Sequence, residues 1–367
     1  MPKSENPKIH IPSIFKKVLV FQGGGALGAY QLGVFQAIHE NEIEPDWVIG
    51  TSIGAINSGI IAGNPPEKRL EKLQEFWRIL QDNSRQFTEG NKSLFNFLTV
   101  SNGVKGFFTP SFPQWINPNL PLGIEKSAYY NTDPLRETLK DLINIDYLNS
   151  KRVRITVGAV NANIGEMRYF DSLQETLTLD HILASGALPP AFPAIRINGE
   201  PYWDGGIFSN TPIEAVLEDH PRKSSIIFSV QLWNPVSEEP NSINKVLTKQ
   251  KDIQFSSRDH FLDKEKKLHR LRHTIRRLTD HLNEEQKSSP QIKELMTWGC
   301  DSIMHIIHLT IDRMEGEDQY KDIDFSSKGI QFRSQTGYKE ASRAIKSEIW
   351  NHAHDELEGI HIHTQFR

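Results

Sequence analysis

The sequence has 367 residues, of which 37% are hydrophobic and 24% are charged, and its formal net charge at pH 7 is −4. The length suits one large domain with an appendage, or two domains, and the charge gives no electrostatic case for nucleic acid. The single cysteine excludes an internal disulfide framework. No stretch approaches the roughly 18 uninterrupted apolar residues of a membrane span, and residues 1–10 lack the apolar core of a signal peptide. We therefore expect a soluble, cytoplasmic protein in which any membrane contact is peripheral.

The first predicted element is a buried strand at residues 17–21, where the chain is compact and apolar. A glycine loop follows, and then a segment at residues 29–39 with apolar residues at helical spacing. The loop satisfies Gly-x-Gly-x-x-Gly at Gly23, Gly25 and Gly28, which is the pattern of dinucleotide-binding oxidoreductases. Such folds also need an acidic residue at the end of the second strand, and this chain has Gly-Thr-Ser there. The dinucleotide interpretation therefore lacks its second anchor.

The same glycine loop has an alternative use as an oxyanion hole. Adjacent glycines at a helix N-terminus expose backbone N–H groups with no side chains in the way. Gly23, Gly24 and Gly25 are the predicted donors. Close packing of the helix against the strand would explain the glycines equally well if the loop stood alone.

Residues 47–57 read Trp-Val-Ile-Gly-Thr-Ser-Ile-Gly-Ala-Ile-Asn and are predicted to turn sharply from a strand into a helix. Gly50 and Gly54 let the two elements approach closely, which leaves Ser52 strained and exposed above the helix N-terminus. This is the geometry of a nucleophile elbow, so Ser52 is the candidate nucleophile. Two neighbouring strands would bring the elbow and the glycine loop together at one edge of the sheet.

The remaining strands and helices alternate, which predicts an α/β fold with a mostly parallel central sheet and helices on both faces. Helices are expected at residues 67–80, 133–148 and 180–187, and strands at residues 152–160, 168–170 and 225–233. A proline-broken segment at residues 87–118 either packs on the domain or forms a lid for an acyl chain. Its aromatic residues are Phe87, Phe95, Phe97, Phe107, Phe108, Phe112 and Trp115.

A third block, Asp204-Gly205-Gly206, is followed by Asn210 and preceded by a stretch rich in small residues and prolines at residues 184–193. With the glycine loop and the serine elbow, this block resembles, in the same order, the motifs of the patatin-like phospholipase family. The resemblance covers roughly residues 15–235 and implies the fold of that family.

The chain departs from the family pattern inside the glycine loop. Many members carry an aspartate before the glycines and a basic residue among them, where this chain has Gln22 and Leu27. Because oxyanion donors are backbone groups, the departure bears on how the loop is anchored more than on activity.

The resemblance implies a Ser-Asp dyad. Ser52 would attack an ester carbonyl, and Asp204 would accept the proton and return it to the leaving alcohol. A carboxylate can do this only in a partly dry site that raises its pKa. A triad of Ser52, Asp204 and His220 is the alternative, but the elbow lies at the second strand and His220 precedes a proline in a charged stretch.

A polar, proline-bearing connection at residues 234–242 marks a predicted boundary. We expect an N-terminal tail at 1–14, a catalytic domain at 15–235 and a mainly helical extension at 236–367. The extension resembles one of unassigned role in a bacterial subset of the family, through Asp322-Ile-Asp-Phe-Ser and Gly337-Tyr338.

Within the extension, five apolar residues step by three and four along a basic helix, and they are Leu268, Leu271, Ile275, Leu278 and Leu282. Its cations are Lys264, Lys266, Lys267, Arg270, Arg272, Arg276 and Arg277. One interpretation is a helix docked through this apolar seam on the catalytic domain or on a second copy, which would make a homo-oligomer. The other is a basic amphipathic surface attracted to anionic phospholipid headgroups.

Four histidines near the C-terminus, His352, His354, His361 and His363, have neither cysteines nor suitably spaced carboxylates beside them. We therefore expect no metal and no cofactor. The resemblance implies a serine acyl hydrolase that acts on phospholipids or lysophospholipids, whereas the residues alone indicate an ester. A catalytically idle, membrane-binding adaptor and a dinucleotide-binding oxidoreductase are the alternatives.

Overall fold

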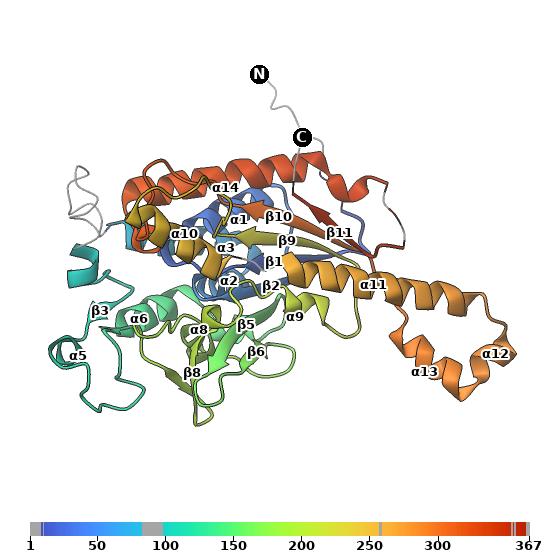
Figure 1. The fold of residues 1–367 in the computed structure, drawn as a ribbon, viewed down its shortest axis with the longest axis horizontal. Coiled ribbons are helices and arrows are strands. Elements are labelled where there is room, and N and C mark those ends of the chain that lie inside the picture. Colours follow the sequence, from blue (N-terminus) through green and yellow to red (C-terminus); the bar gives the residue numbers. More distant parts are fainter. Residues whose placement is uncertain are drawn as a thin grey trace, which may run out of the picture.

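The computed structural model describes residues 9, 11–82, 98–256, 259–353, 355 and 357–364. Their central feature is a nine-stranded sheet between layers of helices (Figure 1). The strand order is β11-β10-β9-β1-β2-β5-β8-β7, and β6 pairs with β5. These strands are β1 (Lys16–Phe21), β2 (Trp47–Thr51), β5 (Arg154–Asn161), β6 (Met167–Asp171), β7 (Ile195–Ile197), β8 (Glu200–Asp204), β9 (Ser225–Gln231), β10 (Met304–Thr310) and β11 (Ile360–His363).

The sheet is parallel from β11 through β5 and antiparallel beyond it, where β6, β7 and β8 lie. This confirms the predicted, mostly parallel α/β architecture. Since the parallel strands end at a common edge, the loops that follow β1 and β2 lie side by side there. A separate small sheet pairs β3 (Thr109–Pro110) with β4 (Tyr130–Asn131).

Side chains alternate between two apolar layers along β1. Leu19 and Phe21 join the large core with α1 (Ala29–Glu40), α2 (Ile53–Ala62), α3 (Pro66–Asp82) and α14 (Ser327–Ser347). Val18 and Val20 join a smaller core with α9 (Glu214–Leu217) and the start of α11 (Asp259–Asp280). The sheet is therefore covered on both faces, as the uninterrupted apolar strands predict. The other helices are α5 (Phe112–Ile116), α6 (Asp133–Leu142), α7 (Ile145–Leu148), α8 (Leu179–Ser185), α10 (Ile243–Phe255), α12 (Glu284–Ser288) and α13 (Pro290–Trp298).

The C-terminal part of the chain adds to the same sheet. Strand β10 pairs with β9 along its whole length, and β11 pairs with β10. Both strands lie in the extension that was expected to be mainly helical, and neither was predicted. Helix α14 packs along α1 (Figure 1), and the glycines at the contact, Gly33 of α1 and Gly337 of α14, are both buried. The domain boundary at residue 235 stays a prediction, but the two parts share one sheet.

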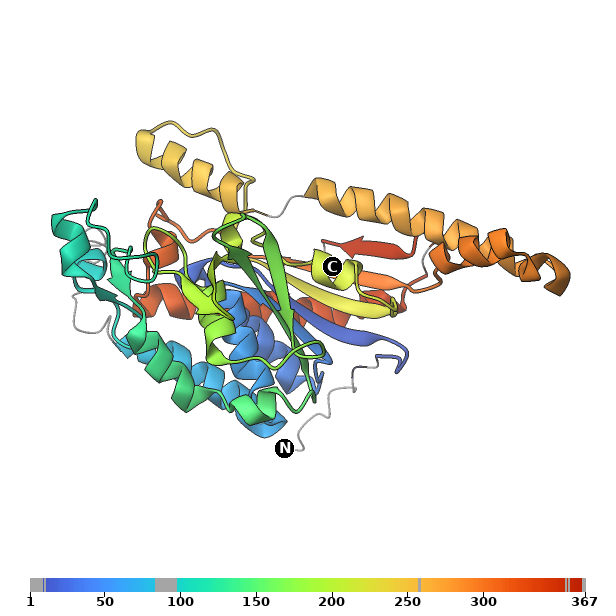
Figure 2. The same cartoon turned by 90° about the horizontal axis from the view of Figure 1, so that it is seen from below.

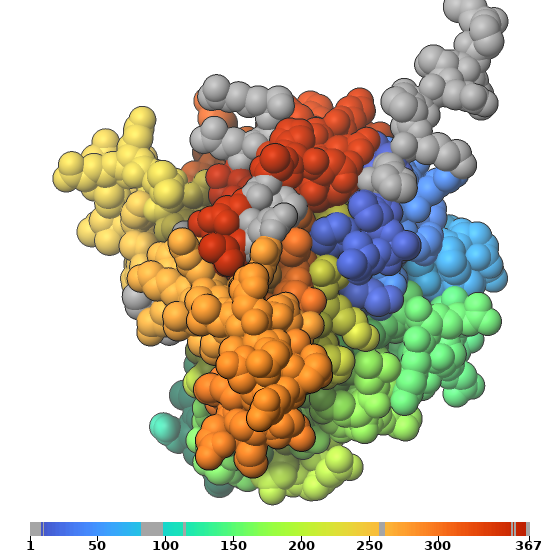
Figure 3. All heavy atoms as spheres, turned by 90° about the vertical axis from the view of Figure 1, so that its right-hand side faces the viewer, coloured from blue at the N-terminus to red at the C-terminus, as the bar shows by residue number. Residues whose placement is uncertain are grey.

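Helices α11, α12 and α13 extend beyond the sheet (Figure 2), and they face the viewer in Figure 3. We call these three helices the arm. The predicted apolar seam of α11 is only partly covered, because Leu271 is 60% exposed and Leu278 is 64% exposed, whereas Leu268, Ile275 and Leu282 are half-buried. The helix buries Leu262, His269 and His273 most completely. The helix therefore contacts the rest of the chain mainly through its histidine-bearing face, which the sequence did not predict.

No helix of the described residues combines the length and the apolar character needed to cross a bilayer. No group of three or more His, Cys, Asp or Glu side chains in the same ranges is arranged to hold a metal ion. His361 and His363 lie on β11, whereas His354 lies outside the described residues.

The close contact between α1 and α14 gives a test of the shared architecture. A Cβ atom at Gly33 would lie 1.8 Å from the Ser334 carbonyl oxygen. Helix propensity favours alanine over glycine by about 1 kcal/mol, but this clash should reverse the sign. We expect Gly33→Ala to lower the free energy of unfolding by about 1–3 kcal/mol in chemical denaturation.

Gly186→Ala is the matched control, because a Cβ atom there has no neighbour closer than 3.7 Å. Its free energy of unfolding should stay within about 0.5 kcal/mol of the wild type. A stabilised Gly33→Ala protein would show that α14 does not pack on α1 in this way.

Candidate active site

The predicted elbow joins β2 to α2 through Ser52, which has φ 57° and ψ −127°. This left-handed conformation is strained for a residue with a side chain. The flanking glycines explain how the turn is possible. A Cβ atom at Gly50 would lie 2.2 Å from the Gly54 carbonyl oxygen, and one at Gly54 would lie 2.3 Å from the Phe21 carbonyl oxygen. Only glycine fits either position, so the strand, the helix and β1 pack backbone to backbone.

Ser185, at the end of α8, holds the elbow from the neighbouring element. The Ser52 N–H donates to both the carbonyl oxygen and the Oγ of Ser185, at 3.1 and 3.0 Å. The Ser185 hydroxyl in turn donates to the Gly158 carbonyl oxygen at 2.6 Å. Ser185 thus ties the nucleophile elbow to β5. Sequence reasoning missed this role, although the residue lies in the small-residue and proline-rich stretch that supported the resemblance.

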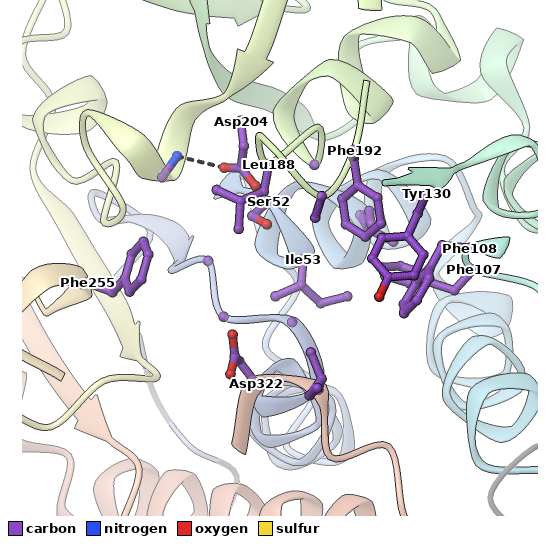
Figure 4. Close-up of a pocket in the computed structure, with 18 of the residues that line it drawn as sticks. Ser52, Ile53, Phe107, Phe108, Tyr130, Leu188, Phe192, Asp204, Phe255 and Asp322 are labelled. Carbon is purple, nitrogen blue, oxygen red and sulfur yellow. Dashed lines mark hydrogen bonds between the residues drawn. The ribbon is translucent and has the colours of Figure 1, made fainter. Parts of the chain in front are cut away.

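Asp204 ends strand β8 and lies beside Ser52 (Figure 4). Its side chain is buried, and one carboxylate oxygen accepts a hydrogen bond from the Gly206 N–H at 2.7 Å. Burial raises the pKa of Asp204 to about 7, while the hydrogen bonds with the Ser52 side chain and the Gly206 N–H act in the opposite direction. The carboxyl group is therefore a much stronger base than an aspartate in water.

The first glycine of this block, Gly205, packs on β5. A Cβ atom at Gly205 would lie 2.6 Å from the Gly158 carbonyl oxygen, so the turn after Asp204 must pass close to that strand. This contact places the carboxylate next to the elbow, since Ser185 reaches the same carbonyl group.

The glycine loop leaves β1 and borders the same site. The Gly23 N–H donates to the Asn210 carbonyl oxygen at 3.1 Å, so Gly23 is not available as the oxyanion donor that the sequence suggested. Its own carbonyl group accepts from Asn210 Nδ2 at 3.1 Å and from Trp233 Nε1 at 2.8 Å. The N–H groups of Gly24 and Gly25 have no acceptor among the described residues. These two groups are left for a ligand.

Gln22 anchors the loop at the position where many family members carry an aspartate. Its side chain is fully buried, and Nε2 donates to Thr211 Oγ1 at 2.7 Å and to the Phe255 carbonyl oxygen at 3.0 Å. Its Oε1 accepts from the N–H groups of Leu232 and Trp233. The amide therefore fixes the loop through donors and acceptors together, which a carboxylate cannot do. Leu27, the other departure, is buried in the apolar core.

A largely apolar cavity of about 190 Å³ opens at these groups (Figure 4). Gly23, Gly24, Gly25, Ser52, Asp204 and Gly206 all border it, so the structure brings together the motif residues that the sequence singled out. Its far wall is aromatic and consists of Phe107, Phe108, Tyr130, Phe192 and Phe325. No histidine of the described residues borders the cavity. His220 is exposed and contacts Arg222, so the triad interpretation finds no support.

The predicted aromatic segment divides into two groups. Phe107 and Phe108 are buried and line the cavity, whereas Phe112 and Trp115 of α5 are exposed. Phe87, Phe95 and Phe97 lie outside the described residues. Part of the segment is therefore a wall of the cavity, and its action as a lid stays a prediction.

Comparison with known proteins agrees with these motifs. A family model described as patatin-like phospholipase matches residues 19–217, and another described as patatin phospholipase matches residues 253–357. Lysophospholipase NTE1 of Candida glabrata is 27% identical over 247 residues, which are 61% of this chain and 12% of that protein. The Saccharomyces cerevisiae protein of the same name is 27% identical over 263 residues, with 62% and 13% covered. The chain thus spans about an eighth of the length of these curated relatives.

Among solved structures, VipD from Legionella pneumophila has a TM-score of 0.42 at 14% identity and covers 97% of this chain and 72% of that one. A likeness of this size carries no argument about function, so the assignment rests on the sequence. The first family model spans more than half of the chain and contains the glycine loop, the elbow and Asp204. The chain belongs to the patatin-like phospholipase family.

Proposed function

We propose that this protein is a serine acyl hydrolase that cleaves fatty-acyl esters of phospholipids or lysophospholipids, with Ser52 as nucleophile and Asp204 as general base. The observation that carries the proposal is the buried Asp204 carboxylate beside the strained Ser52, with its pKa raised to about 7. A base with this pKa can accept a proton near neutral pH, which an ordinary aspartate cannot do efficiently.

The reaction follows from the positions of these groups. The Ser52 hydroxyl attacks the ester carbonyl while Asp204 accepts its proton. The oxyanion receives hydrogen bonds from the N–H groups of Gly24 and Gly25, and loss of one such donor typically costs about 3 kcal/mol of transition-state stabilisation. Asp204 then returns the proton to the leaving alcohol, and water hydrolyses the acyl-enzyme by the same steps in reverse order.

The cavity supports a lipid as substrate. Its aromatic wall suits an acyl chain, and no lysine or arginine of the described part of the chain borders it. A charged headgroup is therefore expected to stay near the opening. The lysophospholipases NTE1 of Candida glabrata and Saccharomyces cerevisiae are similar to 61% and 62% of this chain, which is why we include lysophospholipids.

Labelling by a fluorophosphonate tests the nucleophile. Wild type should gain one adduct by intact-mass spectrometry, and Ser52→Ala should gain none and release no fatty acid, because the attacking oxygen is absent. Ser58→Ala is the matched control, since Ser58 is buried in the same helix α2 and does not border the cavity. Fatty-acid release by Ser52→Ala would overturn the mechanism, and an unreactive wild type would favour the adaptor alternative.

The pKa of Asp204 sets the pH dependence of the reaction. The base must be ionised to accept a proton, so kcat/KM should rise with pH and level off above about pH 7. The measurement is hydrolysis of a soluble ester between pH 5 and 9. A rate that already levels off near pH 4 would contradict a buried general base, because an exposed aspartate titrates at about 3.9.

The burial of Asp204 should also make the free energy of unfolding depend on pH. Because the folded-state pKa exceeds the unfolded value of about 3.9, ionisation of Asp204 opposes folding as the pH rises towards 7. Asp204→Asn removes this effect. Its free energy of unfolding relative to wild type should increase by about 1 kcal/mol per pH unit between pH 4 and 7 and then stay constant. A difference that does not change with pH would show that the carboxylate is not buried.

We also propose that the outer face of the arm contacts anionic lipid. Leu271 and Leu278 lie on that face, and Lys264, Lys267 and Arg270 are exposed there as well. Apolar side chains among cations suit a membrane surface rich in anionic headgroups. A second copy that presented this face would bring like charges together, which makes self-association less favourable.

Charge reversal tests this contact. The triple change of Lys264, Lys267 and Arg270 to glutamate should weaken binding to phosphatidylserine vesicles at least about tenfold. The control is the same change at Lys328, Lys339 and Lys346, which are exposed on α14. Equal binding by both triple variants would show that the arm does not contact the vesicle.

A further inference from the structure

Two pieces of the C-terminal part of the chain border the cavity, Phe255 at the end of α10 and residues 320–325, which we call the wall segment. Asp322, Ile323 and Phe325 border the cavity, although the family motifs all lie before residue 215. Phe325 is buried, and its ring centroid lies 5.7 Å from that of Phe107. The aromatic wall is thus built from both halves of the sequence.

The backbone of the wall segment lies directly on the glycine loop. Gly25 has φ 53°, and a Cβ atom there would lie 2.3 Å from the Asp322 carbonyl oxygen. The loop and the wall segment are therefore in backbone contact, and only glycine permits this approach. The segment supports the loop whose N–H groups we propose as oxyanion donors.

Reciprocal ion pairs hold the wall segment on α10. Lys251 contacts both carboxylate oxygens of Asp322, at 2.7 and 2.8 Å. Its neighbour Asp252 is fully buried and pairs with Lys321, which is itself 3% exposed. Two adjacent residues of α10 thus form ion pairs with two adjacent residues of the wall segment. A buried pair of this kind is strongly constrained in position.

A second set of contacts fixes the other end of the segment. Arg333 of α14 is fully buried and donates to the Asp324 carbonyl oxygen at 2.8 Å. The wall segment is therefore held from α10 on one side and from α14 on the other, which leaves Phe325 in a defined position at the end of the cavity.

The cavity extends from Ser52 towards a group of aromatic rings. Ser52 lies between Phe255 on one side and the rings of Phe107, Phe108 and Phe192 on the other, with Ile53 and Leu188 close to it (Figure 4). An acyl chain attached to Ser52 would run along these apolar side chains towards the rings. Phe325 packs on Phe107 there, so an acyl chain long enough to reach these rings would meet Phe325 as well.

We propose that the wall segment closes the acyl-binding cavity and that Phe325 and Ile323 determine the length of the acyl chain that the enzyme cleaves. This inference rests on the proposed hydrolase function and assigns a role to the C-terminal part of the chain. That part is then a component of the specificity pocket and not an accessory to it.

The test is the chain-length profile of kcat/KM for p-nitrophenyl esters from butyrate to hexadecanoate. Phe325→Ala enlarges the end of the cavity and should raise the ratio of dodecanoate to butyrate hydrolysis about tenfold, whereas Phe325→Trp should lower it. Ile330→Ala is the matched control, because Ile330 is buried in the C-terminal part but does not border the cavity. Its profile should match the wild type.

Phe325 is also part of the core, so a second pair of variants guards against loss of folding. Ile323 is only half-buried, and Ile323→Ala and Ile323→Phe should move the profile towards longer and shorter chains respectively. Folded variants at both positions with the wild-type profile would overturn the role of the wall segment. Failure of the hydrolase proposal looks different, because wild type itself would then neither react with a fluorophosphonate nor cleave any ester.

Discussion

The site depends on one steric constraint, the backbone-to-backbone packing of β1, β2 and α2 around the elbow. Side chains are excluded at Gly50 and Gly54, and this permits the left-handed conformation of Ser52. Such a conformation costs on the order of 1–3 kcal/mol and persists only where the surroundings determine it fully. The buried strands and the hydrogen bonds from Ser52 to Ser185 hold Ser52 in this conformation. The proposed nucleophile, Ser52, is therefore positioned by the packing of the sheet edge.

Hydrogen bonds from polar side chains fix the position of the glycine loop next to the elbow. Gln22, Asn210 and Trp233 together engage the loop carbonyl groups, the end of β9 and the end of α10. The N–H groups of Gly24 and Gly25, which we propose as oxyanion donors, belong to this anchored loop, and both residues border the cavity. Preorganised donors stabilise developing charge without reorganisation during the reaction. A buried glutamine can thus replace the charged anchor that the family pattern usually contains.

Sequence patterns predicted the mostly parallel α/β fold and grouped Ser52, Asp204 and the glycines at one site, because glycine spacing reports directly on backbone approach. Strands β7 and β8 were not predicted. Sequence patterns did not predict the features that depend on contacts between residues far apart in the sequence. Strand β10 is a short apolar run that periodicity cannot distinguish from other buried segments. The buried face of α11 depends on contacts to the sheet, and the engagement of Gly23 depends on Asn210, far away along the chain. None of these contacts has a local signature.

The predicted boundary at residue 235 therefore describes a change in sequence pattern more than a change in packing. A chain cut there would leave the β9 edge of the sheet unpaired, although Ile226, Ile227 and Phe228 are fully buried. It would also lose the wall segment that lies on Gly25. The polar surface and the helices of the C-terminal part make it look separate in the sequence, but its strands and its wall segment complete the sheet and the cavity. The proposed catalytic residues and the wall segment that borders the same cavity thus come from different parts of the sequence.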